Sequence, residues 1–504
     1  MKSGLFSFIS ATLLLFLAVG FASGATEDKA VVYLDNAIGS DGNDGSSPSP
    51  AGENVGPVAS ISRACDLLQE SGKLIIKNTG RPYRGSLILV GKGGTPEQPL
   101  IIEGNHATLE GLEAAKPSDW KVEQDRIISM EFSGAGIGFF VVRDGIPPIW
   151  AKSLKDIQPG ENFHDKAANR GYYCLPEGKS LQDLKLEVPT GGCGCGVEII
   201  GASNIIIRNL QCRYFCNDGF NFQGECEGLL LEHIEGYLNG DQGFSCHATV
   251  SCVVVDGNFH NNDSGIADTA FSRSSFYGVL VSANRSYGVL FEGGEHSIVN
   301  GTITNNPISI TLEGAKGVDS LPGTPFNPYA NCRLCLRNTC VEGGDFGLKI
   351  KEGSRASVNY CVFRDQPTNL ILADDQARLH MLNSIVAPRA GGKVLDCSSS
   401  QTYWGDYNCW ASHSAAMNHQ VVDISDIGAH SEIEAHSLVA DPLFASNRGP
   451  QIQANSPARG KAYVDPTYYP WLKSSGVIDP EYPPDKFPLM YPDLYPDMGC
   501  VVLH

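Results

Sequence analysis

Acidic residues recur at a regular distance in the middle of the chain. Asp241 and Asp263 each stand two residues before a Gly that opens a short alternating strand, and Asp218 lies near the same place one repeat earlier. If the repeats stack, Asp241 and Asp263 lie one layer apart, at roughly 5 Å, the spacing between neighbouring strands. Two carboxylates at that separation suit a retaining glycosidase, in which one is the nucleophile and the other the acid and base. Repulsion between them would raise the pKa of one, as a general acid requires.

Further residues could act on or bind the same substrate. His247 is predicted to project from the same repeat as Asp241. Elimination needs a base and a cation that neutralises charge, and Arg and Lys side chains can serve as either. Trp404 belongs to an aromatic cluster on which a sugar ring could stack. The candidate catalytic groups are therefore Asp218, Asp241, Asp263 and His247, and the candidate substrate-binding groups are Arg273, Arg285, Lys349 and Trp404.

Other interpretations of these residues stay open. An Asp just before a Gly commonly serves the turn itself, and a lone His is more often a satisfied polar residue. Stacked carboxylates cost energy unless they are used or neutralised, and calcium, which takes carboxylate oxygens, is the candidate cofactor. The sequence assigns no metal ligands. The functional alternatives are a glycoside hydrolase, a polysaccharide lyase or epimerase with an Arg or His base, and a non-catalytic glycan-binding or scaffold protein.

The repeats that would position these residues begin at about residue 200. Each has a polar turn with Asn or Asp, then Gly or a substitute, then a short apolar strand, and a second apolar strand follows. The step before Leu348 is longer because an insertion rich in Pro and Gly occupies 317–329. The pattern predicts an all-β chain wound as a right-handed parallel β-helix, in which each coil buries its apolar face against its neighbours. The first apolar strand residues are predicted to be Phe220, Phe244, Ile266, Val289, Ile308, Leu348 and Leu370.

Asparagines precede these strands and predict a structural ladder. Asn tolerates left-handed turns and can bond its own backbone. Stacked coil on coil, their side chains would form a row of amides. The residues concerned are Asn217, Asn239, Asn262, Asn284 and Asn306.

The two ends and one inserted segment interrupt the repeats. Residues 1–24 read as a signal peptide, with Lys2 before an apolar run and small residues for cleavage. Residues 25–112 should form the N-terminal cap and first coils, with an amphipathic helix over 58–69 and Leu74–Ile76 as the first strand. A β-rich module is predicted over 113–196, the central coils over 197–440 and an irregular C-terminal cap over 441–504.

Composition limits the functions and the compartment. The 504 residues carry a formal net charge of −19, which argues against broad nucleic-acid binding. After signal cleavage no segment is apolar enough to span a bilayer, so we expect a secreted monomer, extracellular or periplasmic, whose partner is a polysaccharide. The 16 Cys all lie in the mature chain and predict disulfides together with some buried free thiols. Cys340 and Cys361 are expected to stack in neighbouring coils.

Several segments resemble exported proteins of the pectin-lyase-like β-helix superfamily. The segment Tyr33–Ser46 is similar to their opening strand and loop, and Asp441–Phe444, Ser456–Gly460 and Asp497–Cys500 resemble their closing segment. The stretch from Phe139 to Val188 resembles a module inserted in β-helix glycoside hydrolases. This resemblance implies the fold and a polysaccharide substrate.

A looser resemblance is to polygalacturonases of glycoside hydrolase family 28. It rests on Cys216–Gly219 followed one coil later by Asp241-Gln242. Gln242 stands where that family has a second Asp, and the family's Gly-His-Gly is absent, so pectin specificity does not follow.

Overall fold

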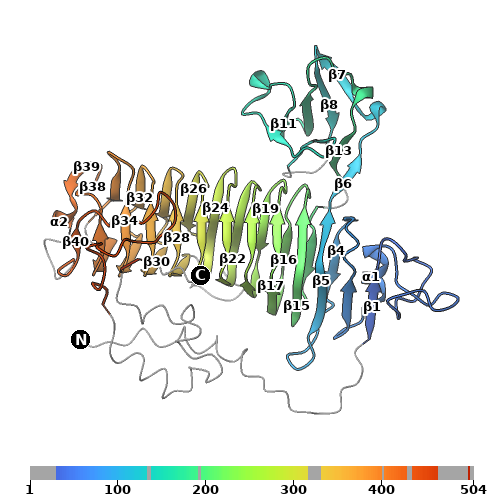
Figure 1. The fold of residues 1–504 in the computed structure, drawn as a ribbon, viewed down its shortest axis with the longest axis horizontal. Helices are drawn as coiled ribbons and strands as arrows, with labels where there is room; N and C mark the ends of the chain where they lie inside the picture. The colour runs from blue at the N-terminus through green and yellow to red at the C-terminus, as the bar shows by residue number, and fades with distance from the viewer. Residues whose placement is uncertain are drawn as a thin grey trace, which may run out of the picture.

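The chain is a parallel β-helix of about 13 turns that carries a small β-rich module near its N-terminal end (Figure 1). The computed structural model describes residues 30–132, 138–190, 194–315, 331–399, 402–427, 434–463 and 498–499. The predicted signal peptide and the insertion at 317–329 lie outside the described residues. Within them, no helix is long and apolar enough to cross a membrane.

Each central coil contributes three strands, and strands of the same kind stack in parallel rows along the axis. The first row is β4 (Leu87–Val90), β14 (Val197–Ile200), β16 (Phe220–Gln223), β19 (Gln242–Cys246), the first halves of β22 (Ser264–Tyr277) and β24 (Tyr287–Val299), β26 (Ile308–Glu313), β29 (Phe346–Ile350), β32 (Thr368–Leu372), β35 (Lys393–Cys397) and β38 (Ser414–Met417). The second row is β1 (Val31–Leu34), β2 (Lys73–Ile76), the first halves of β5 (Leu100–Glu110) and β15 (Ile205–Arg213), β17 (Glu225–Glu232), β20 (Thr249–Val255), the second halves of β22 and β24, β27 (Arg333–Arg337), β30 (Arg355–Asn359), β33 (Arg378–Leu382) and β36 (Tyr403–Asp406). The third row is β3 (Tyr83–Arg84), the ends of β5 and β15, β18 (Glu235–Tyr237), β21 (Asn258–His260), β23 (Leu280–Ser282), β25 (Thr302–Thr304), β28 (Cys340–Glu342), β31 (Val362–Arg364), β34 (Ile385–Ala387), β37 (Cys409–Trp410) and β40 (Leu438–Val439).

Alternation of apolar and polar residues decides which side chains enter the tube. Phe220 pairs with Phe244, and Phe244 with Ile266, so apolar side chains stack inside while their neighbours face outward. The predicted register is confirmed except at Ile308. That residue pairs with Tyr287, and Ile310 is the true partner of Val289. Ile308 and Ile310 have the same parity and both are apolar, so alternation alone cannot tell them apart.

The asparagine ladder runs along the corner between the third and first rows. The side-chain amide of Asn239 donates to Asn262 at 3.0 Å, that of Asn262 to Asn284 at 3.3 Å, and that of Asn284 to Asn306 at 3.0 Å. All four are buried. Asn217 is not part of this ladder, because it occupies the position that follows the bend, in line with Asp241. Stacked amides satisfy buried polar groups that would otherwise cost free energy.

A short helix covers the N-terminal end. Helix α1 (Ile61–Leu67) begins after Ser60, whose side chain accepts a hydrogen bond from the Arg63 amide, and it buries Ile61 and Ala64. The helix is shorter than the predicted 58–69. Apolar residues with helical spacing continue into the turns on both sides, so the pattern alone predicts a longer helix. The first strand is β1 rather than 74–76, and it pairs with β2.

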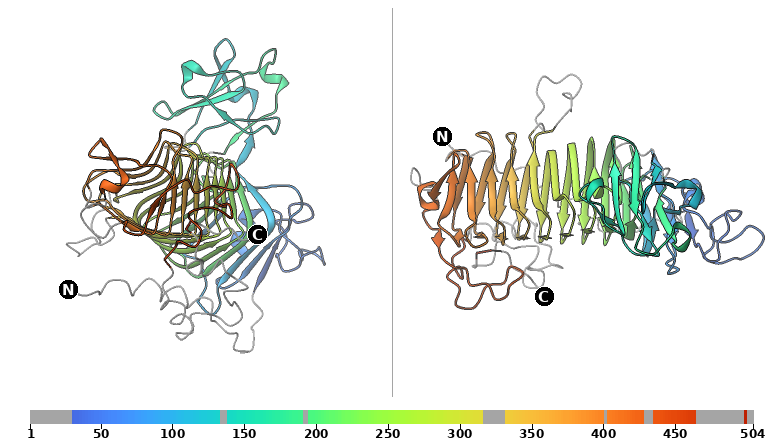
Figure 2. Two further views of the ribbon diagram at one scale, coloured as in Figure 1. Left: turned by 60° about the vertical axis from the view of Figure 1, so that its left-hand side comes forward. Right: turned by 90° about the horizontal axis from the view of Figure 1, so that it is seen from above.

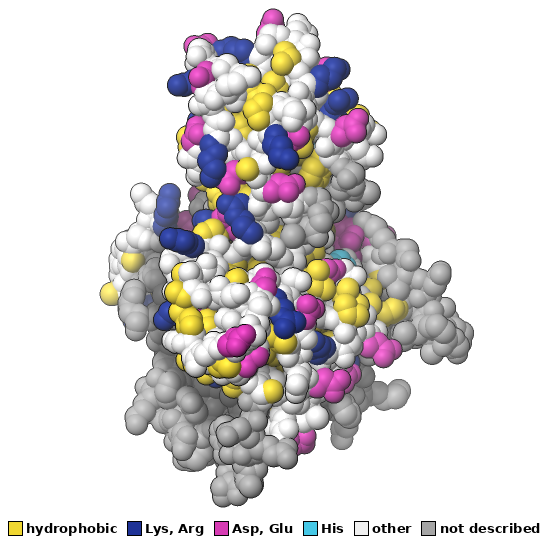
Figure 3. All heavy atoms as spheres, turned by 90° about the vertical axis from the view of Figure 1, so that its right-hand side faces the viewer, with side chains coloured by type: hydrophobic (Ala, Val, Ile, Leu, Met, Phe, Trp, Pro, Cys, Tyr) yellow, Lys and Arg dark blue, Asp and Glu magenta, His cyan; other side chains and the backbone are white. Residues whose placement is uncertain are grey.

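The inserted module leaves the β-helix after β5 and returns at β14 (Figures 1 and 2). It has a three-stranded sheet and a five-stranded sheet, mostly antiparallel. Phe139, Trp120 and Tyr173 are buried in its core. Figure 3 shows side chains of both charges interspersed over its surface. Its strands are β6 (Leu112–Ala114), β7 (Lys121–Gln124), β8 (Ile127–Glu131), β9 (Val142–Arg143), β10 (Ile149–Trp150), β11 (Glu161–Asp165), β12 (Arg170–Cys174) and β13 (Leu186–Pro189).

The C-terminal end has a different construction. Strand β39 (Gln420–Asp423) pairs with β38 in antiparallel fashion, and α2 (Ile424–Ile427) follows it. Beyond β40 the chain turns back along the outside, where Ala458 and Met498 pack against Ile385. This return stabilises the last coils.

The cysteines differ in part from expectation. No disulfide joins any two of the 14 described cysteines, and most of these thiols are buried. Cys340 pairs with Val362, so the expected stacking of Cys340 on Cys361 is wrong by one residue. The sulfur atoms of Cys246 and Cys252 lie 3.6 Å apart, farther than in a disulfide. Buried thiols here act chiefly as small apolar side chains.

Candidate active site

Asp241 and Asp263 occupy equivalent positions in neighbouring coils. The Asp263 amide donates to the carbonyl of Asp241 at 2.8 Å, and the Asp241 amide donates to the carbonyl of Asn217 at 3.0 Å. The column continues to Ser286, whose amide donates to Asp263 at 2.8 Å. Both side chains lie at the corner just before the first strand row. One coil, about 4.8 Å, therefore separates the two residues.

The surroundings of Asp241 favour its protonated form. It is partly buried, and burial together with the charges of Asp218 and Asp263 raises the pKa of Asp241 to about 7. Lys166 and Arg285 oppose this shift. The side-chain amide of Gln242 donates to Asp241 at 2.6 Å. A carboxyl group with a pKa near 7 is suited to general acid catalysis at neutral pH.

Asp218 is part of the internal structure of the same corner. Its side chain is buried and accepts three hydrogen bonds, from the Gln242 amide at 3.0 Å, the Asn221 side chain at 2.7 Å and the Ser245 hydroxyl at 2.7 Å. Burial nevertheless raises the pKa of Asp218. With only 1% of its surface exposed, Asp218 positions neighbours and acts on Asp241 through charge.

His247 projects from the first row, as expected from the alternation. Its Nδ1 lies 3.1 Å from the Thr269 hydroxyl in the next coil. Burial lowers the pKa of His247, although the charge of Asp218 works in the opposite direction. A neutral imidazole at this place can accept a proton or a hydrogen bond from a sugar hydroxyl.

Arg285 joins the carboxylates to the inserted module. Its Nη2 lies 3.7 Å from Oδ1 of Asp263 and donates to the carbonyl of Gly240 at 3.1 Å. The guanidinium carbon lies 3.7 Å from the centre of the Trp150 ring. Burial lowers the pKa of Arg285 to about 10, against the opposing effect of Asp263 and Asp241. Nη1 of Arg285 is buried without a hydrogen-bond partner in the structure.

Two residues of the module belong to this site, and the sequence analysis did not predict them. Trp150 covers Arg285, and the charge of Lys166 acts on Asp241. The module is anchored beside them by the Gly138 amide, which donates to the carbonyl of Cys216 at 2.7 Å. Repeat spacing cannot place residues that lie outside the repeats. Glu198, one coil before Asn221 in the first row, was also missed, and burial and Asp218 raise its pKa.

Three predicted substrate-binding residues lie elsewhere. Lys349 faces outward from the same row as Ser245, but four coils farther along, or about 19 Å at the strand spacing. Arg273 is exposed beyond the bulge in β22 and pairs with Ser251 and Glu295. Trp404 lies in the second row near the C-terminal end, where it stacks on His380 at 4.2 Å. Of the four, the structure brings only Arg285 to the carboxylates.

Comparisons with known proteins agree on the architecture. A complex of XylC with xylose matches with a TM-score of 0.53 at 9% identity, covering 83% of this chain and 88% of that one. The chain therefore has the same parallel β-helix fold as this structure. The pectate lyase Pel9A aligns with a TM-score of 0.49 at 11% identity, over 87% of this chain and 92% of its own. No family model and no curated protein matches the sequence.

The β-helix holds a second polar cluster, in its interior. Asp268 faces inward, accepts hydrogen bonds from Ser274 and from the Cys246 amide, and lies 3.6 Å from His296. The Ser274 hydroxyl is 2.7 Å from Nδ1 of His296. Burial raises the pKa of Asp268 to about 7 and lowers that of His296 to about 4, so His296 is neutral near pH 7 and Asp268 keeps its proton about half of the time. No substrate reaches this cluster, because all three side chains are buried.

The structure also bears on calcium. Among the residues that the structure describes, no group of three or more His, Cys, Asp or Glu side chains is arranged to hold a metal ion. Asp241 and Asp263 supply two carboxylates, and Asp218 directs its oxygens to three donors of the protein. A calcium ion bound here would need further oxygen ligands from the substrate or from water.

Proposed function

We propose that the chain is a secreted enzyme that cleaves a polysaccharide by hydrolysis, with retention of configuration. The observation that carries this proposal is the stack of Asp241 and Asp263, in which burial and two neighbouring carboxylates raise the pKa of Asp241 to about 7. The fold of the matching solved structures is compatible with this activity, but a fold does not determine chemistry.

The two carboxylates would divide the work. Asp241 in its protonated form donates to the glycosidic oxygen as that oxygen leaves, while a carboxylate oxygen of Asp263 attacks the anomeric carbon. The side chain of Asp263 is 38% exposed and is held by Arg285 and the Ser286 hydroxyl at 3.2 Å. Asp241 then takes a proton from water, and that water releases the sugar from Asp263. Their separation of about one coil suits direct attack.

A second candidate is elimination from a uronate-containing chain. The observation that favours it is Arg285, whose pKa burial lowers to about 10 and whose Nη1 has no partner in the structure. A lyase base removes the proton beside the uronate carboxylate, and the double bond forms as the glycosidic oxygen leaves. His247 is the alternative base for this reaction, and for epimerisation.

One assay separates these candidates. A panel of neutral and acidic polysaccharides is incubated with the purified chain, and new reducing ends and the ultraviolet absorbance of unsaturated uronates are read together. Hydrolysis yields reducing ends alone, whereas elimination yields both signals. Absence of both signals on every polysaccharide, with binding retained, would favour epimerisation, which cleaves no glycosidic bond, or the scaffold or glycan-binding alternative.

Export and oligomeric state need their own measurements. We propose that the first 24 residues are removed on export and that the mature protein is a monomer. N-terminal sequencing of protein from the extracellular or periplasmic fraction should start close to Ala25. Light scattering should give the mass of one chain. Retention of Met1 in the cell would refute export.

A further inference from the structure

Asp268, Ser274 and His296 form a polar cluster inside the tube that the proposed cleavage does not use. Asp268 and Ser274 belong to the coil that begins at Asp263, and His296 belongs to the next coil. All three side chains are buried. The hydroxyl of Ser274 lies between its two neighbours, hydrogen-bonded to Oδ2 of Asp268 and 2.7 Å from Nδ1 of His296.

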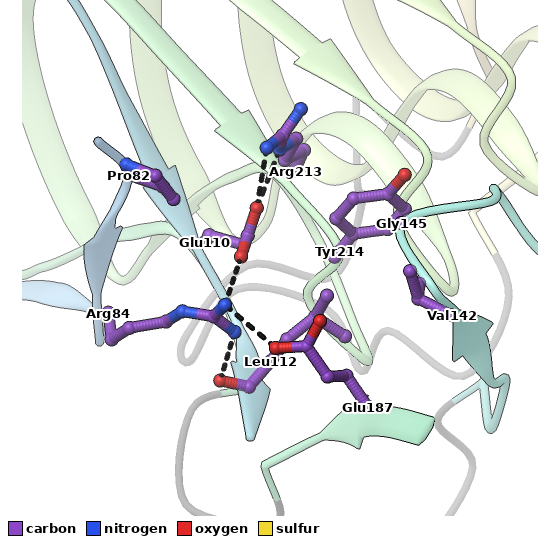
Figure 4. A pocket seen from close by; sticks show the side chains of 9 residues that line it. All are labelled: Pro82, Arg84, Glu110, Leu112, Val142, Gly145, Glu187, Arg213 and Tyr214. Atoms are coloured by element: carbon purple, nitrogen blue, oxygen red, sulfur yellow. Dashed lines mark hydrogen bonds and ion pairs between the residues drawn. The ribbon is translucent and has the colours of Figure 1, made fainter. Parts of the chain in front are cut away.

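Another buried carboxylate of the protein is neutralised by cations. Glu110 binds the guanidinium groups of Arg84 at 2.9 Å and of Arg213 at 2.7 Å (Figure 4). Such cations offset the free energy that a carboxylate loses when it leaves water. Asp268 differs, because no Lys or Arg among the described residues pairs with it. The basic side chain beside it is His296, 3.6 Å away.

The other titratable groups that face this space are thiols. Cys246 precedes Asp268 in the inward column of the first row, and Cys252 stands one coil earlier in the second row. Cys332 lies just before β27, and the charge of Asp268 acts on it. Burial raises the pKa of Cys246 and that of Cys332, so both thiols stay uncharged. The thiols therefore provide no countercharge for Asp268.

The hydrogen bonds determine how many protons the cluster holds. Nε2 of His296 lies 2.9 Å from the carbonyl oxygen of Gly293, and a carbonyl only accepts, so Nε2 carries a proton. Ser274 has one hydroxyl proton for two neighbours. If Ser274 donates to Nδ1, then Oδ2 of Asp268 carries a proton, and if it donates to Oδ2, then Nδ1 carries one. Both arrangements hold one proton more than a carboxylate beside a neutral imidazole.

Burial selects the arrangement without charges. The ring of Phe291 stacks on His296 with 3.9 Å between the ring centres, and Leu334 pairs with His296 in the next coil. Two separate charges in such apolar surroundings cost more free energy than a neutral acid and a neutral imidazole. The same burial raises the pKa of Asp268 to about 7 and lowers that of His296 to about 4. Between these values Asp268 donates to Ser274, and Ser274 donates to His296.

We propose that this neutral chain of three side chains keeps the stability of its coils constant in weakly acidic solution. In an unfolded chain, Asp ionises above about pH 3.9 and His is charged below about pH 6.5. Between these values the unfolded pair also holds one proton, on the imidazole. Folding then transfers that proton from His296 to Asp268 and exchanges none with the solvent, so the pH does not shift the balance.

The cancellation joins two opposite contributions. The raised pKa of Asp268 alone would make the folded state less stable as the pH rises from about 4 to 7. The lowered pKa of His296 alone would make it less stable as the pH falls from about 6.5 to 4. This balance goes beyond the proposed function, because it concerns the stability of the coils and no step of cleavage.

Single substitutions in the full chain should uncover the two contributions. Asp268→Asn keeps the shape of the protonated acid without its titration, and His296→Gln removes the imidazole. Hydrogen exchange in peptides from 264–276 and 287–298 reports how often these coils open, and each variant is compared with the unaltered chain at the same pH. From pH 4.5 to 6.5, relative protection should rise by up to about tenfold per pH unit in Asp268→Asn and fall by up to about tenfold per pH unit in His296→Gln.

Two further variants complete this test. The double variant with both substitutions should show neither slope, because both titrations are removed. Asp256→Asn is the control, since its side chain is 55% exposed, and it should follow the unaltered chain. Single variants that both follow the unaltered chain at every pH, or slopes of the same sign in the two, would overturn the proposal.

Nuclear magnetic resonance of the unaltered chain covers the case in which a variant fails to fold. In protein with ¹⁵N-labelled histidine, the ring nitrogen shifts distinguish a neutral ring from a charged one. His296 is identified by its contacts with the stacked ring of Phe291. We expect His296 to be neutral and protonated on Nε2 at pH 5, where an exposed histidine is charged. A His296 ring protonated on both nitrogens at pH 5 would refute the neutral chain.

Discussion

Arg285 and Trp150 stack across the joint between the β-helix and its inserted module, with the guanidinium carbon 3.7 Å from the ring centre. Arg285 also lies 3.7 Å from Asp263, so one side chain links the module to the carboxylate column. Phe140, which is buried, packs edge to face against Trp150, with 6.1 Å between the ring centres. The position of the module therefore determines the surroundings of the two carboxylates.

Loss of this stacking should impair the proposed activity. Trp150→Ala removes the cation–π contact and opens Arg285 to water, which weakens its hold on Asp263. We expect a fall in kcat/KM of about 10- to 100-fold, measured on whichever polysaccharide the screen identifies. Trp404→Ala is the control, because Trp404 is 44% exposed and lies in a different strand row. Similar losses in both variants would count against the assignment.

Removal of either stacked carboxylate should abolish most turnover. Asp241→Asn deletes the proton donor and Asp263→Asn the nucleophile, and groups of this kind contribute about 10²- to 10⁴-fold. Asp256→Asn is the matched control, since its side chain is 55% exposed in a turn on another edge. Circular dichroism should show that all three variants are folded. Full activity in Asp241→Asn or Asp263→Asn would remove that residue from the mechanism.

The pH profile should follow the protonation of Asp241. Its pKa is raised to about 7, so the acid form predominates below pH 7 and is lost above it. We expect kcat to fall as the pH rises through about 7. Asp218→Asn removes one of the charges that raise this pKa, so the alkaline limb should move to lower pH. An alkaline limb that stays at the same pH would show that the charge of Asp218 does not raise the pKa of Asp241.

The same shift has a consequence for stability. Asp241 binds its proton more tightly in the folded chain than in the unfolded chain. The stabilisation that this proton gives the folded state is therefore fully present below the unfolded-state pKa of Asp241, and it is lost as the pH rises toward 7. Asp241→Asn should therefore raise the melting temperature more at pH 8 than at pH 4. Calorimetric scans at both pH values test this, and an equal effect at both would contradict the raised pKa.

An asparagine of the ladder should contribute more to the free energy of unfolding than an asparagine on the surface. Asn262→Ala removes the side chain that accepts a hydrogen bond from the backbone N–H of Asn239 and donates one to the carbonyl of Gly236. Both of these backbone groups are buried and lose their partner. Each unsatisfied buried group costs roughly 1–3 kcal/mol, so we expect a loss of at least about 2 kcal/mol in the free energy of unfolding. Asn447→Ala, in an exposed turn, is the control and should change little. Denaturant titration measures both.

The repeat made much of the site predictable. The spacing of strand and turn residues places Asp241 and Asp263 in neighbouring layers, and the backbone hydrogen bonds confirm it. The outward positions of Ser245 and His247 follow from alternation in the same way. Such predictions hold because stacking converts distance along the chain into a fixed position on the surface.

Burial and the inserted module could not be predicted from the repeat. Asp218 is one of the predicted catalytic groups, yet it is almost completely enclosed by its own hydrogen-bond donors. The inward direction of Asp268 is also exceptional, since that row is otherwise lined by side chains such as Phe222 and Phe291. Trp150 reaches Arg285 only through the fold of the module, which has no periodicity that relates it to the coils.

The insertion between β5 and β14 has a consequence for biosynthesis. Strands β4 and β5 hydrogen-bond to β14 and β15, which emerge from the ribosome only after residues 111–196 have been made. Until then the growing tube ends in an unpaired strand edge, the kind of surface that recruits other chains. The module forms its sheets from local, mainly antiparallel pairings, so it can fold during this interval. A nascent chain arrested just before residue 197 would accordingly present the edge most in need of a chaperone.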